Sequence, residues 1–141
     1  MNLTQKKNID LLIDHFWKHG YLTISRKFGT YLPEPTKIGE HEVDIIAKYK
    51  SDYAIGLILN AEDIESPSIA NKLTFLASRQ TRWTNKKVVL FVGVPFQLYG
   101  KAKIIIQSLS EEVKKNIRLI QIIDPSINQT VIRKKQRTLF S

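Results

Sequence analysis

The chain has 141 residues, enough for one domain that buries a hydrophobic core without disulfides or a structural metal. It contains no cysteine, which excludes disulfide and thiolate chemistry and favours an intracellular protein. No run approaches the roughly 18 apolar residues of a membrane span, and residues 1–7 lack the apolar segment of a signal peptide. We therefore expect a soluble, cytoplasmic protein.

Positive charge is concentrated in the second half of the sequence. Residues 1–78 contain nine Lys and Arg and ten Asp and Glu, a net charge of −1, whereas residues 79–141 contain thirteen and three, a net charge of +10. Such asymmetry indicates a surface that binds a polyanion, with nucleic acid as the commonest partner and an anionic membrane surface as the lesser candidate. A basic protein without such a partner is the alternative.

The first 60 residues predict a helix, an extended segment and a β-hairpin. Residues 5–19 carry apolar side chains at helical spacing, and a glycine follows as a stop signal. Residues 21–24 should be extended. The hairpin has two apolar runs, 42–49 and 52–60, joined by a short polar turn.

The second half alternates helices and strands. The predicted elements are a helix, a strand, a helix and a strand over residues 67–82, 88–94, 99–115 and 117–123. Asp63 or Ser66 could cap the first of these helices. The run at 88–94 is apolar throughout, as in a central strand covered on both faces. Together the elements predict an α/β fold with a mixed β-sheet flanked by helices, formed by residues 1–125 and followed by a basic tail at 126–141.

Asp44 is the most informative residue of the hairpin. It lies among Val43, Ile45 and Ile46 on the first strand, where an unpaired carboxylate is costly to bury. It must therefore lie at a strand end, find a partner or bind a cation. A hydrogen-bonded residue at the end of the strand is the structural explanation, and a metal ligand is the functional one.

The order of elements, with an acidic residue inside the first hairpin strand, resembles the PD-(D/E)XK nuclease fold and, within it, the archaeal Holliday junction resolvases. The similarity covers roughly residues 5–123 and implies a restriction-endonuclease-like sheet. In that family, as the resemblance implies, the first strand ends in an Asp, to which Asp44 corresponds, the second carries Glu-x-Lys, and an acid of the first helix completes the site. The carboxylates would hold Mg²⁺, which activates water and neutralises charge developing at phosphorus, and the lysine would orient the nucleophile.

The remaining motif positions depart from this pattern. Ile58 and Asn60 stand where Glu and Lys are expected, and neither side chain supplies a charge. A three-residue turn in the hairpin would place Asp44 opposite Ile58. A two-residue turn would instead pair Asp44 with Leu57 and break this correspondence. In either register the lysine is missing, so we expect a nuclease-like fold that lacks conventional cleavage.

An active enzyme with relocated catalytic acids is the alternative. Asp44 and Glu42 would then be the catalytic residues, and Asp44 would be the ligand of a Mg²⁺ cofactor. Further acids that could substitute lie just beyond the hairpin and on the first helix, namely Glu62, Asp63, Asp10 and Asp14.

Other constellations carry less information. His15 and His19 have a spacing that can bind a metal, but no third ligand is evident, so a solvated pair is the favoured interpretation. His41 lies near Glu42 and could influence its protonation. Gly56, within the second hairpin strand, could mark a bulge or a close backbone approach.

The strongest candidate for nucleic-acid binding is the segment 79–87. It combines four positive charges with a tryptophan, which suits phosphate contacts together with a stacking or wedging ring. The candidate residues are Arg79, Arg82, Trp83, Lys86 and Lys87. Trp83 could instead cover the edge of the core. A second set could extend the surface or form a solvated lysine-rich face, namely Lys101, Lys103, Lys114, Lys115 and Arg118.

The tail holds two further candidates. Three basic residues could add phosphate contacts, namely Arg133, Lys134 and Lys135. Residues 136–140 resemble the start of the peptide by which archaeal replication and repair proteins dock on the sliding clamp. In that case Gln136 would hydrogen-bond in its own pocket while Leu139 and Phe140 enter an apolar groove. A basic tail that strengthens DNA binding by charge alone is the alternative.

Three functional hypotheses follow. The first is a nucleic-acid-binding protein of nuclease-like fold, with DNA favoured, that serves repair or recombination and needs no cofactor for binding. The second is an active, Mg²⁺-dependent, structure-selective endonuclease similar to Holliday junction resolvases. The third is a non-catalytic assembly subunit recruited by its tail. Because the resolvases act as two-fold dimers, the resemblance also implies a homodimer.

Overall fold

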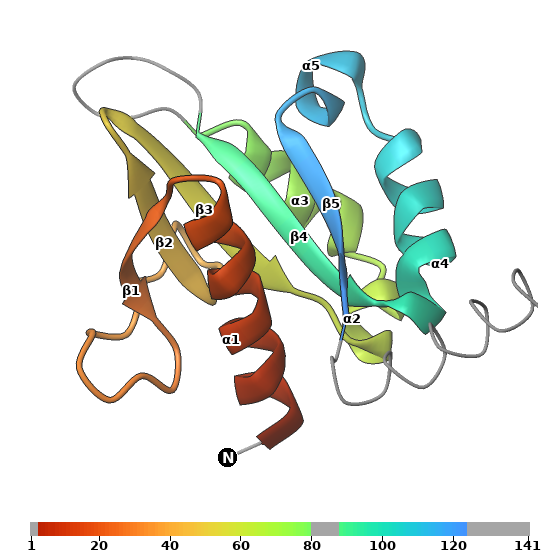
Figure 1. The fold of residues 1–141 in the computed structure, drawn as a ribbon. Helices are drawn as coiled ribbons and strands as arrows, with labels where there is room; N and C mark the ends of the chain where they lie inside the picture. The colour runs from red at the N-terminus through yellow and green to blue at the C-terminus, as the bar shows by residue number, and fades with distance from the viewer. Residues whose placement is uncertain (1–2, 80–87, 124–141) are drawn as a thin grey trace, which may run out of the picture.

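The computed structural model describes residues 3–79 and 88–123 of the chain. These residues form five helices and five strands (Figure 1), and none of these helices has the length and hydropathy needed to cross a membrane. In chain order the elements are α1 (Leu3–Lys18), β1 (Leu22–Arg26), β2 (Ile45–Tyr49), β3 (Asp52–Ile58), α2 (Ala61–Glu65), α3 (Ile69–Ala77), β4 (Val89–Pro95), α4 (Phe96–Gln107), α5 (Glu111–Lys114) and β5 (Ile117–Ile122).

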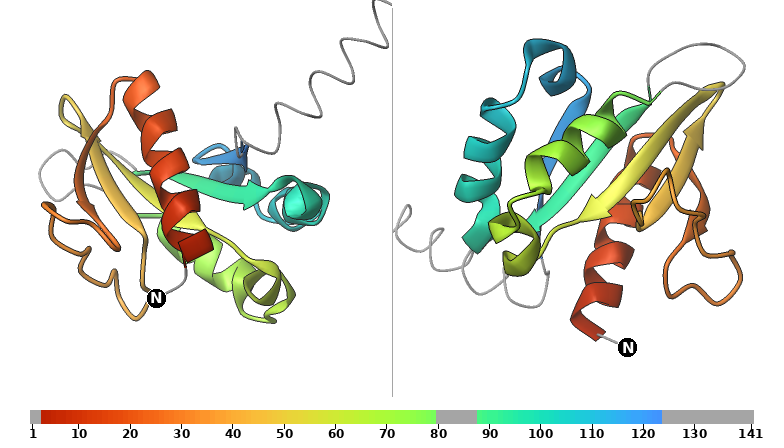
Figure 2. Two further views of the ribbon diagram at one scale, coloured as in Figure 1. Left: turned by 60° about the horizontal axis from the view of Figure 1, so that its bottom comes forward. Right: turned by 180° about the vertical axis from the view of Figure 1, so that it is seen from behind.

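The strands form one mixed sheet in the order β1-β2-β3-β4-β5. The first three strands are antiparallel neighbours, whereas β4 and β5 run parallel to β3. Parallel neighbours need a crossover connection, and here α2 and α3 connect β3 to β4 while α4 and α5 connect β4 to β5. Figures 1 and 2 show α1 on one face of the sheet and α3 and α4 on the other. The predicted α/β fold, a mixed sheet flanked by helices, is confirmed.

α1 covers one face because its apolar residues recur at helical spacing. Ile9, Leu12 and Phe16 are fully buried and belong to one cluster with Ile45 of β2 and Phe91 of β4. The rings of Phe16 and Phe91 meet edge to face, with 4.7 Å between their centroids. Full burial of one such side chain contributes about 1.5–3 kcal/mol, so this apolar stripe holds α1 on the sheet.

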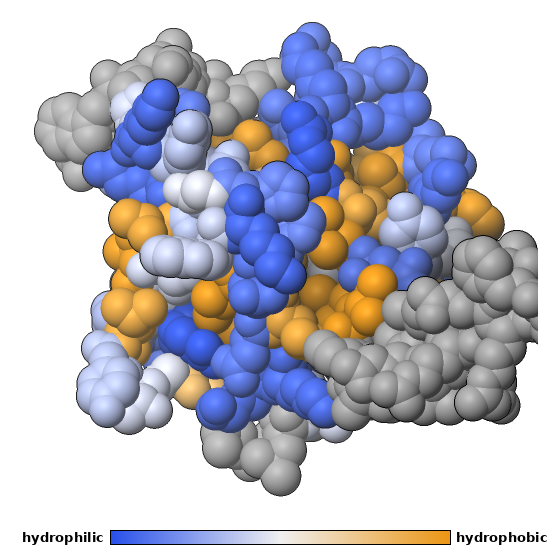
Figure 3. Space-filling view, in the orientation of Figure 1, coloured by the Kyte–Doolittle hydropathy of each residue, from blue (hydrophilic) through white to orange (hydrophobic). Residues whose placement is uncertain are grey.

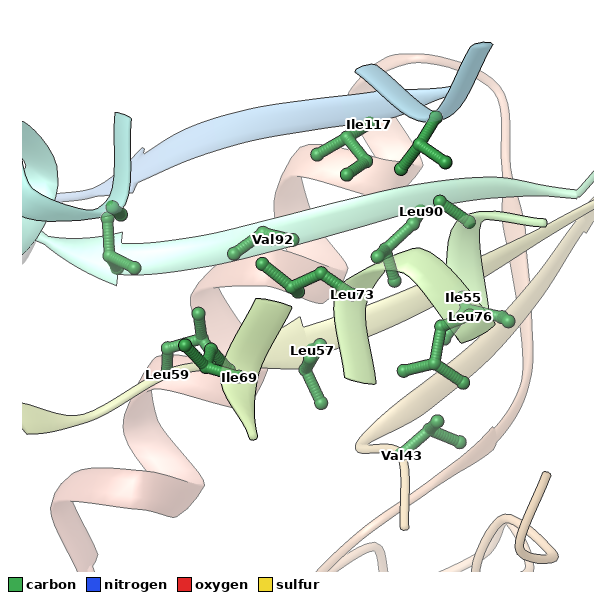
Figure 4. Close-up of a cluster of buried hydrophobic side chains, with 14 of the residues drawn as sticks. Val43, Ile55, Leu57, Leu59, Ile69, Leu73, Leu76, Leu90, Val92 and Ile117 are labelled. Atoms are coloured by element: carbon green, nitrogen blue, oxygen red, sulfur yellow. The ribbon is translucent and has the colours of Figure 1, made fainter. Parts of the chain in front are cut away.

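α3 and α4 cover the opposite face. Leu73 and Leu76 of α3 are buried in a second cluster with Leu90 and Val92 of β4 (Figure 4). Phe91, between the last two, belongs to the cluster under α1. β4 is therefore buried on both faces, as its continuous apolar sequence predicts.

The helix predicted at residues 67–82 differs from the structure at both ends. It ends at Ala77, and a separate short helix, α2, precedes it. The prediction that Asp63 or Ser66 is the N-cap of this helix is wrong, because Ser68 is the N-cap of α3. The preceding helix, α2, is capped by Asn60. Asn60 Oδ1 accepts the backbone N–H of Asp63 at 2.9 Å, and Asp63 Oδ2 accepts the backbone N–H of Asn60 at 2.9 Å. This reciprocal capping box starts the helix directly after β3.

The helix predicted at residues 99–115 is two helices. α4 begins earlier, at Phe96, and ends at Gln107. α5 begins after Ser110, whose side chain accepts the backbone N–H of Val113. Such a cap satisfies a donor that has no partner within the helix, so the chain starts a new helix at this point.

The hairpin between β2 and β3 has a two-residue turn at residues 50–51, and its ladder pairs Ile45 with Gly56. The three-residue alternative is therefore wrong. Asp44 does not continue the regular pairing, because its N–H donates to the carbonyl of Gly56 at 3.0 Å. Asp44 and Ile45 thus both lie opposite Gly56, as in a β-bulge.

The glycine at position 56 allows a close approach between β3 and its neighbours. A Cβ atom there would lie 2.9 Å from Ile45 Cβ and 3.0 Å from Phe16 Cε2, closer than side chains normally pack. Gly56→Ala should therefore lower the free energy of unfolding by about 1–3 kcal/mol through overpacking, measured by urea denaturation followed by circular dichroism. Gly100→Ala is the matched control. Gly100 lies within α4, and no atom outside its own stretch of helix lies within 4 Å of an added Cβ. This substitution should stabilise the protein by roughly 0.5–1 kcal/mol, and equal effects of the two changes would contradict the close approach.

Candidate functional site

Asp44 lies directly before β2, and its carboxylate is held by backbone groups and a lysine. Its side chain is 5% exposed. Oδ2 accepts the backbone N–H of Ile58 at 2.7 Å, at the carboxyl end of β3. The carbonyl oxygen of Asp44 accepts the backbone N–H of Lys27 at 2.9 Å. The structure thus places Asp44 at a strand end with a hydrogen-bonding partner, the structural explanation that the sequence left open.

The second oxygen of the Asp44 carboxylate faces Lys27, a residue that sequence reasoning did not select. Lys27 Nζ lies 3.6 Å from Asp44 Oδ1 and 3.3 Å from Glu42 Oε2. Burial raises the pKa of Asp44, against the opposing effects of the Ile58 N–H and of Lys27 and Lys72. The hydrogen bond from Lys27 lowers the pKa of Glu42. The Lys27 ammonium therefore forms ion pairs with both candidate catalytic acids.

The residues at the departing motif positions have structural roles. Ile58 is 8% exposed and packs in the cluster under α1. Asn60 is the N-cap of α2, and its side-chain oxygen is occupied by the N–H of Asp63. Ile58 and Asn60 therefore supply neither a carboxylate nor a lysine at these positions, and the lysine that does lie beside Asp44 is Lys27, from the segment after β1.

The Glu42 and Asp44 carboxylates do not fit a Mg²⁺ site. One oxygen of Asp44 accepts a backbone N–H, the other faces the Lys27 ammonium, and Glu42 is 63% exposed. Among residues 3–79 and 88–123, no three His, Asp or Glu side chains form a group that could hold a metal. Mg²⁺ binds through several oxygen ligands in near-octahedral geometry, which this arrangement of groups does not supply.

The acids suggested as substitutes have other partners. Asp10 pairs with Arg26 and lies 3.6 Å from Lys6 Nζ. Asp14 Oδ2 lies 3.1 Å from Lys18 Nζ. On the part of the chain that the structure describes, these acids of α1 therefore form ion pairs along the helix and with β1 rather than a cluster with Asp44.

Of the binding candidates in segment 79–87 and in the tail, Arg79 alone lies within the described ranges. Its guanidinium lies over the ring of Phe75, 4.0 Å from the ring centroid, and its carbonyl accepts the N–H of Val88 at 2.8 Å. The other binding and docking predictions lie outside the described residues, namely Arg82, Trp83, Lys86, Lys87, Arg133, Lys134, Lys135, Gln136, Leu139 and Phe140.

Asp44 and the Arg79 backbone lie at different ends of the sheet. Val88, which pairs with Arg79, precedes β4 by one residue, whereas Ile58, which pairs with Asp44, lies opposite Gly93 of β4. The five residues of strand from 88 to 93 correspond to roughly 16 Å. The sequence brings both sites into one sheet, but the topology separates them along the strands.

Charge follows the same division. We define the cationic end as the end with the β2–β3 turn and the start of β4 and β5, where seven cations lie: Lys18, Lys48, Lys50, Arg79, Lys114, Lys115 and Arg118. Four described acids lie there too, namely Asp14, Asp52, Glu111 and Glu112. We define the acidic end by the carboxylates around the end of β3, namely Glu42, Asp44, Glu62, Asp63 and Glu65. Three cations lie near Glu42 at this end, namely Lys27, Lys37 and Lys72.

The histidines fit the structural interpretation better than the metal one. The rings of His15 and His19 lie 4.3 Å apart, centroid to centroid, and His19 Nδ1 lies 3.0 Å from the carbonyl oxygen of His15. Burial lowers the pKa of His15, as do His19 and Lys18. His41 lies against Phe75, with 5.1 Å between the rings.

The pH dependence of stability tests the environment of Asp44. Because the pKa of Asp44 is raised in the folded state, folding is favoured by protonation of this group, and that stabilisation is lost as pH rises through the folded pKa. Relative to Asp44→Asn, the wild type should therefore gain stability as pH falls from 7 towards 4, measured by urea denaturation at each pH.

Glu42→Gln is the control with the opposite sign. The pKa of Glu42 is lowered, so its stabilisation is present above the ordinary pKa of 4.5 and is lost as pH falls through the folded pKa. Relative to Glu42→Gln, the wild type should lose stability in this acidic range. A wild type that loses stability relative to Asp44→Asn on acidification would show that Asp44 is held as a favoured anion.

Three comparisons with known proteins give no match. No family model matches the chain, no curated protein matches it, and no solved structure matches it. The resemblance to PD-(D/E)XK nucleases therefore stays a prediction from the sequence.

Proposed function

We propose that this protein binds nucleic acid, with DNA favoured over RNA, through its cationic end, and that it does not cleave its ligand. The observation that carries the proposal is the excess of cations over acids at the cationic end. Seven cations and four acids lie at one end of the described sheet, and the candidate catalytic carboxylates lie at the other. Binding through phosphates depends on such a concentration of Lys and Arg.

The described cations at this end come from separate elements that the sheet brings together. Lys50 lies in the β2–β3 turn, Lys115 follows α5, and Arg118 lies on β5. Arg79 follows α3, whose carboxyl end contacts the start of β5 because Asn116 Nδ2 donates to the Ala77 carbonyl at 3.2 Å. Cations on several elements can contact successive phosphates of one backbone, which supports a polyanion as the ligand.

The acidic end supports the second half of the proposal. Phosphodiester hydrolysis by this kind of fold would need oxygen ligands for a metal and a lysine for the nucleophile. Here both oxygens of Asp44 have partners, the Ile58 N–H and Lys27, and the Lys27 ammonium is itself paired with Asp44 and Glu42. Ile58 and Asn60 serve the core and a helix cap. We therefore propose a nuclease-like fold, as the order of elements implies, that retains binding without conventional cleavage.

Binding should be dominated by phosphate contacts. We expect fluorescein-labelled DNA to bind at low salt, with an affinity that falls linearly on a log–log plot against salt concentration, measured by fluorescence anisotropy. Lys50→Ala and Lys115→Ala should each weaken binding and reduce the slope by about one, the effect of one lost phosphate contact.

Lys37→Ala is the matched control. Lys37 is exposed and lies in the segment before β2, near Glu42, so its removal changes net charge equally without touching the cationic end. Equal losses for all three variants would reduce the effect to net charge and contradict a localised surface. Absence of binding to duplex, branched and single-stranded DNA at low salt would overturn the proposal and favour an assembly subunit.

Incubation of a labelled four-way junction with protein and Mg²⁺ or Mn²⁺ tests cleavage. We expect no product, because the two carboxylate oxygens of Asp44 interact with the Ile58 N–H and the Lys27 ammonium. Asp44→Asn is the suitable comparison, since it keeps an oxygen that can accept the Ile58 N–H. Product that the wild type forms and that Asp44→Asn does not form would establish the active endonuclease instead.

A further inference from the structure

An aromatic groove lies on the α1 face of the sheet, at the cationic end. It encloses about 500 Å³ between α1, β4, β5 and the segments at the starts of β1 and the β2–β3 turn. Its lining residues are His15, His19, Tyr21, Tyr49, Phe91, Arg118 and Ile120. Figure 3 shows apolar surface over β5, between the hydrophilic surfaces of α1 and α4.

Five of the seven lining residues carry rings, and these rings contact one another at an angle. Tyr21 lies 5.5 Å from Phe91 at an interplanar angle of 73° and 5.7 Å from Tyr49 at 49°. His15 lies 6.0 Å from Phe91 at 60°. These three pairs are tilted or edge-on, so the rings in each pair do not stack face to face.

The pairing of β4 with β5 places the cation of Arg118 beside the rings of the groove. Arg118 of β5 pairs with Phe91 of β4, and its Nη1 donates to the carbonyls of Lys115 at 2.7 Å and Ile117 at 3.3 Å. These bonds hold the guanidinium at the rim of the groove. Burial raises the pKa of Tyr21, and Asp52 raises it further, whereas Arg118 lowers it, so one acid also faces this region.

We propose that the aromatic groove stacks unpaired bases of a single-stranded nucleic-acid segment, while Arg118 contacts the adjoining phosphate. The inference rests on the proposed function, because the groove opens at the cationic end that would hold the backbone. Planar bases stack on aromatic side chains, and base–aromatic stacking does not depend on sequence. Lys50 Nζ lies over the Tyr49 ring, 5.4 Å from its centroid, and adds a second cation at this site. Tyr49 is 40% exposed and Tyr21 is half-buried, so both rings can be reached from solvent.

The test compares two labelled probes of about 15 nucleotides, oligo(dT) and an abasic strand with the same number of phosphates. The full chain should bind oligo(dT) more tightly, by fluorescence anisotropy. Tyr21→Ala and Tyr49→Ala should lower that affinity about fivefold or more, the lower range for loss of one stacked base, without changing the salt slope. Tyr49→Phe keeps the ring and should bind like the wild type.

Tyr31→Ala is the matched control, because Tyr31 is 95% exposed and lies outside the groove, in the segment after β1. It should leave both affinities unchanged. Equal binding of the two probes, unaffected by Tyr21→Ala and Tyr49→Ala but still dependent on salt, would overturn the groove and leave the proposed function in place. Absence of binding to any nucleic acid would overturn the proposed function itself.

Two other occupants of the groove are distinguished by the same variants. Size-exclusion chromatography of the wild type should show no concentration-dependent assembly that Tyr49→Ala abolishes. Such assembly would assign the groove to a second copy of the chain and overturn the inference. Tighter oligo(dT) binding in Tyr49→Ala than in the wild type would mean that a protein segment competes for the groove, which would also overturn it.

Discussion

Burial of the Asp44 carboxylate constrains the acidic end of this protein. A carboxylate removed from water must be compensated, and here the Ile58 N–H and the Lys27 ammonium do so in part, because burial still raises the pKa of Asp44. The same contacts join the loop after β1 to the start of β2 and the end of β3. Asp44 thus ties three backbone segments together, and both of its carboxylate oxygens have partners within the fold.

The parallel pairing of β3 with β4 keeps the acidic end apart from the cationic end. In an open α/β sheet, loops at opposite ends of the strands are kept apart by the length of the strands themselves. The pairing of β3 with β4 sets Ile58 beside Gly93 and Ala54 beside Val89, so the acids after β3 and the cations before β4 are on different surfaces. The aromatic groove shares its surface with the cations.

The fold could be predicted from the sequence where a single local signal dominated. The helical spacing of Ile9, Leu12 and Phe16 and the apolar run of β4 each follow from one periodicity. The ends of the predicted helices were harder to place, because they depend on the N-cap residues Asn60 of α2 and Ser110 of α5. The reciprocal pair Asn60 and Asp63 has the spacing of a capping box, a signal in the sequence that is overlooked when position 60 is interpreted as the lysine position of a nuclease motif.

The candidate site could be predicted less well because its partners meet only through the topology. Asp44 was recognisable as a buried carboxylate, but the choice of Lys27 depends on the antiparallel pairing of β1 with β2, and no spacing in the sequence encodes it. The groove is similar, since α1, β4 and β5 contribute residues that are distant in the chain.

The order of strands also has a consequence for how the chain reaches its folded state. β1, β2 and β3 are sequential neighbours, and the two-residue turn makes the β2–β3 pairing local, whereas β4 and β5 join only after crossover segments close. Hairpins of this kind form in roughly 1–10 μs, and non-local parallel pairing is slower. The meander that carries Asp44 is therefore expected to assemble first and to serve as the template on which the surface bearing the groove is completed.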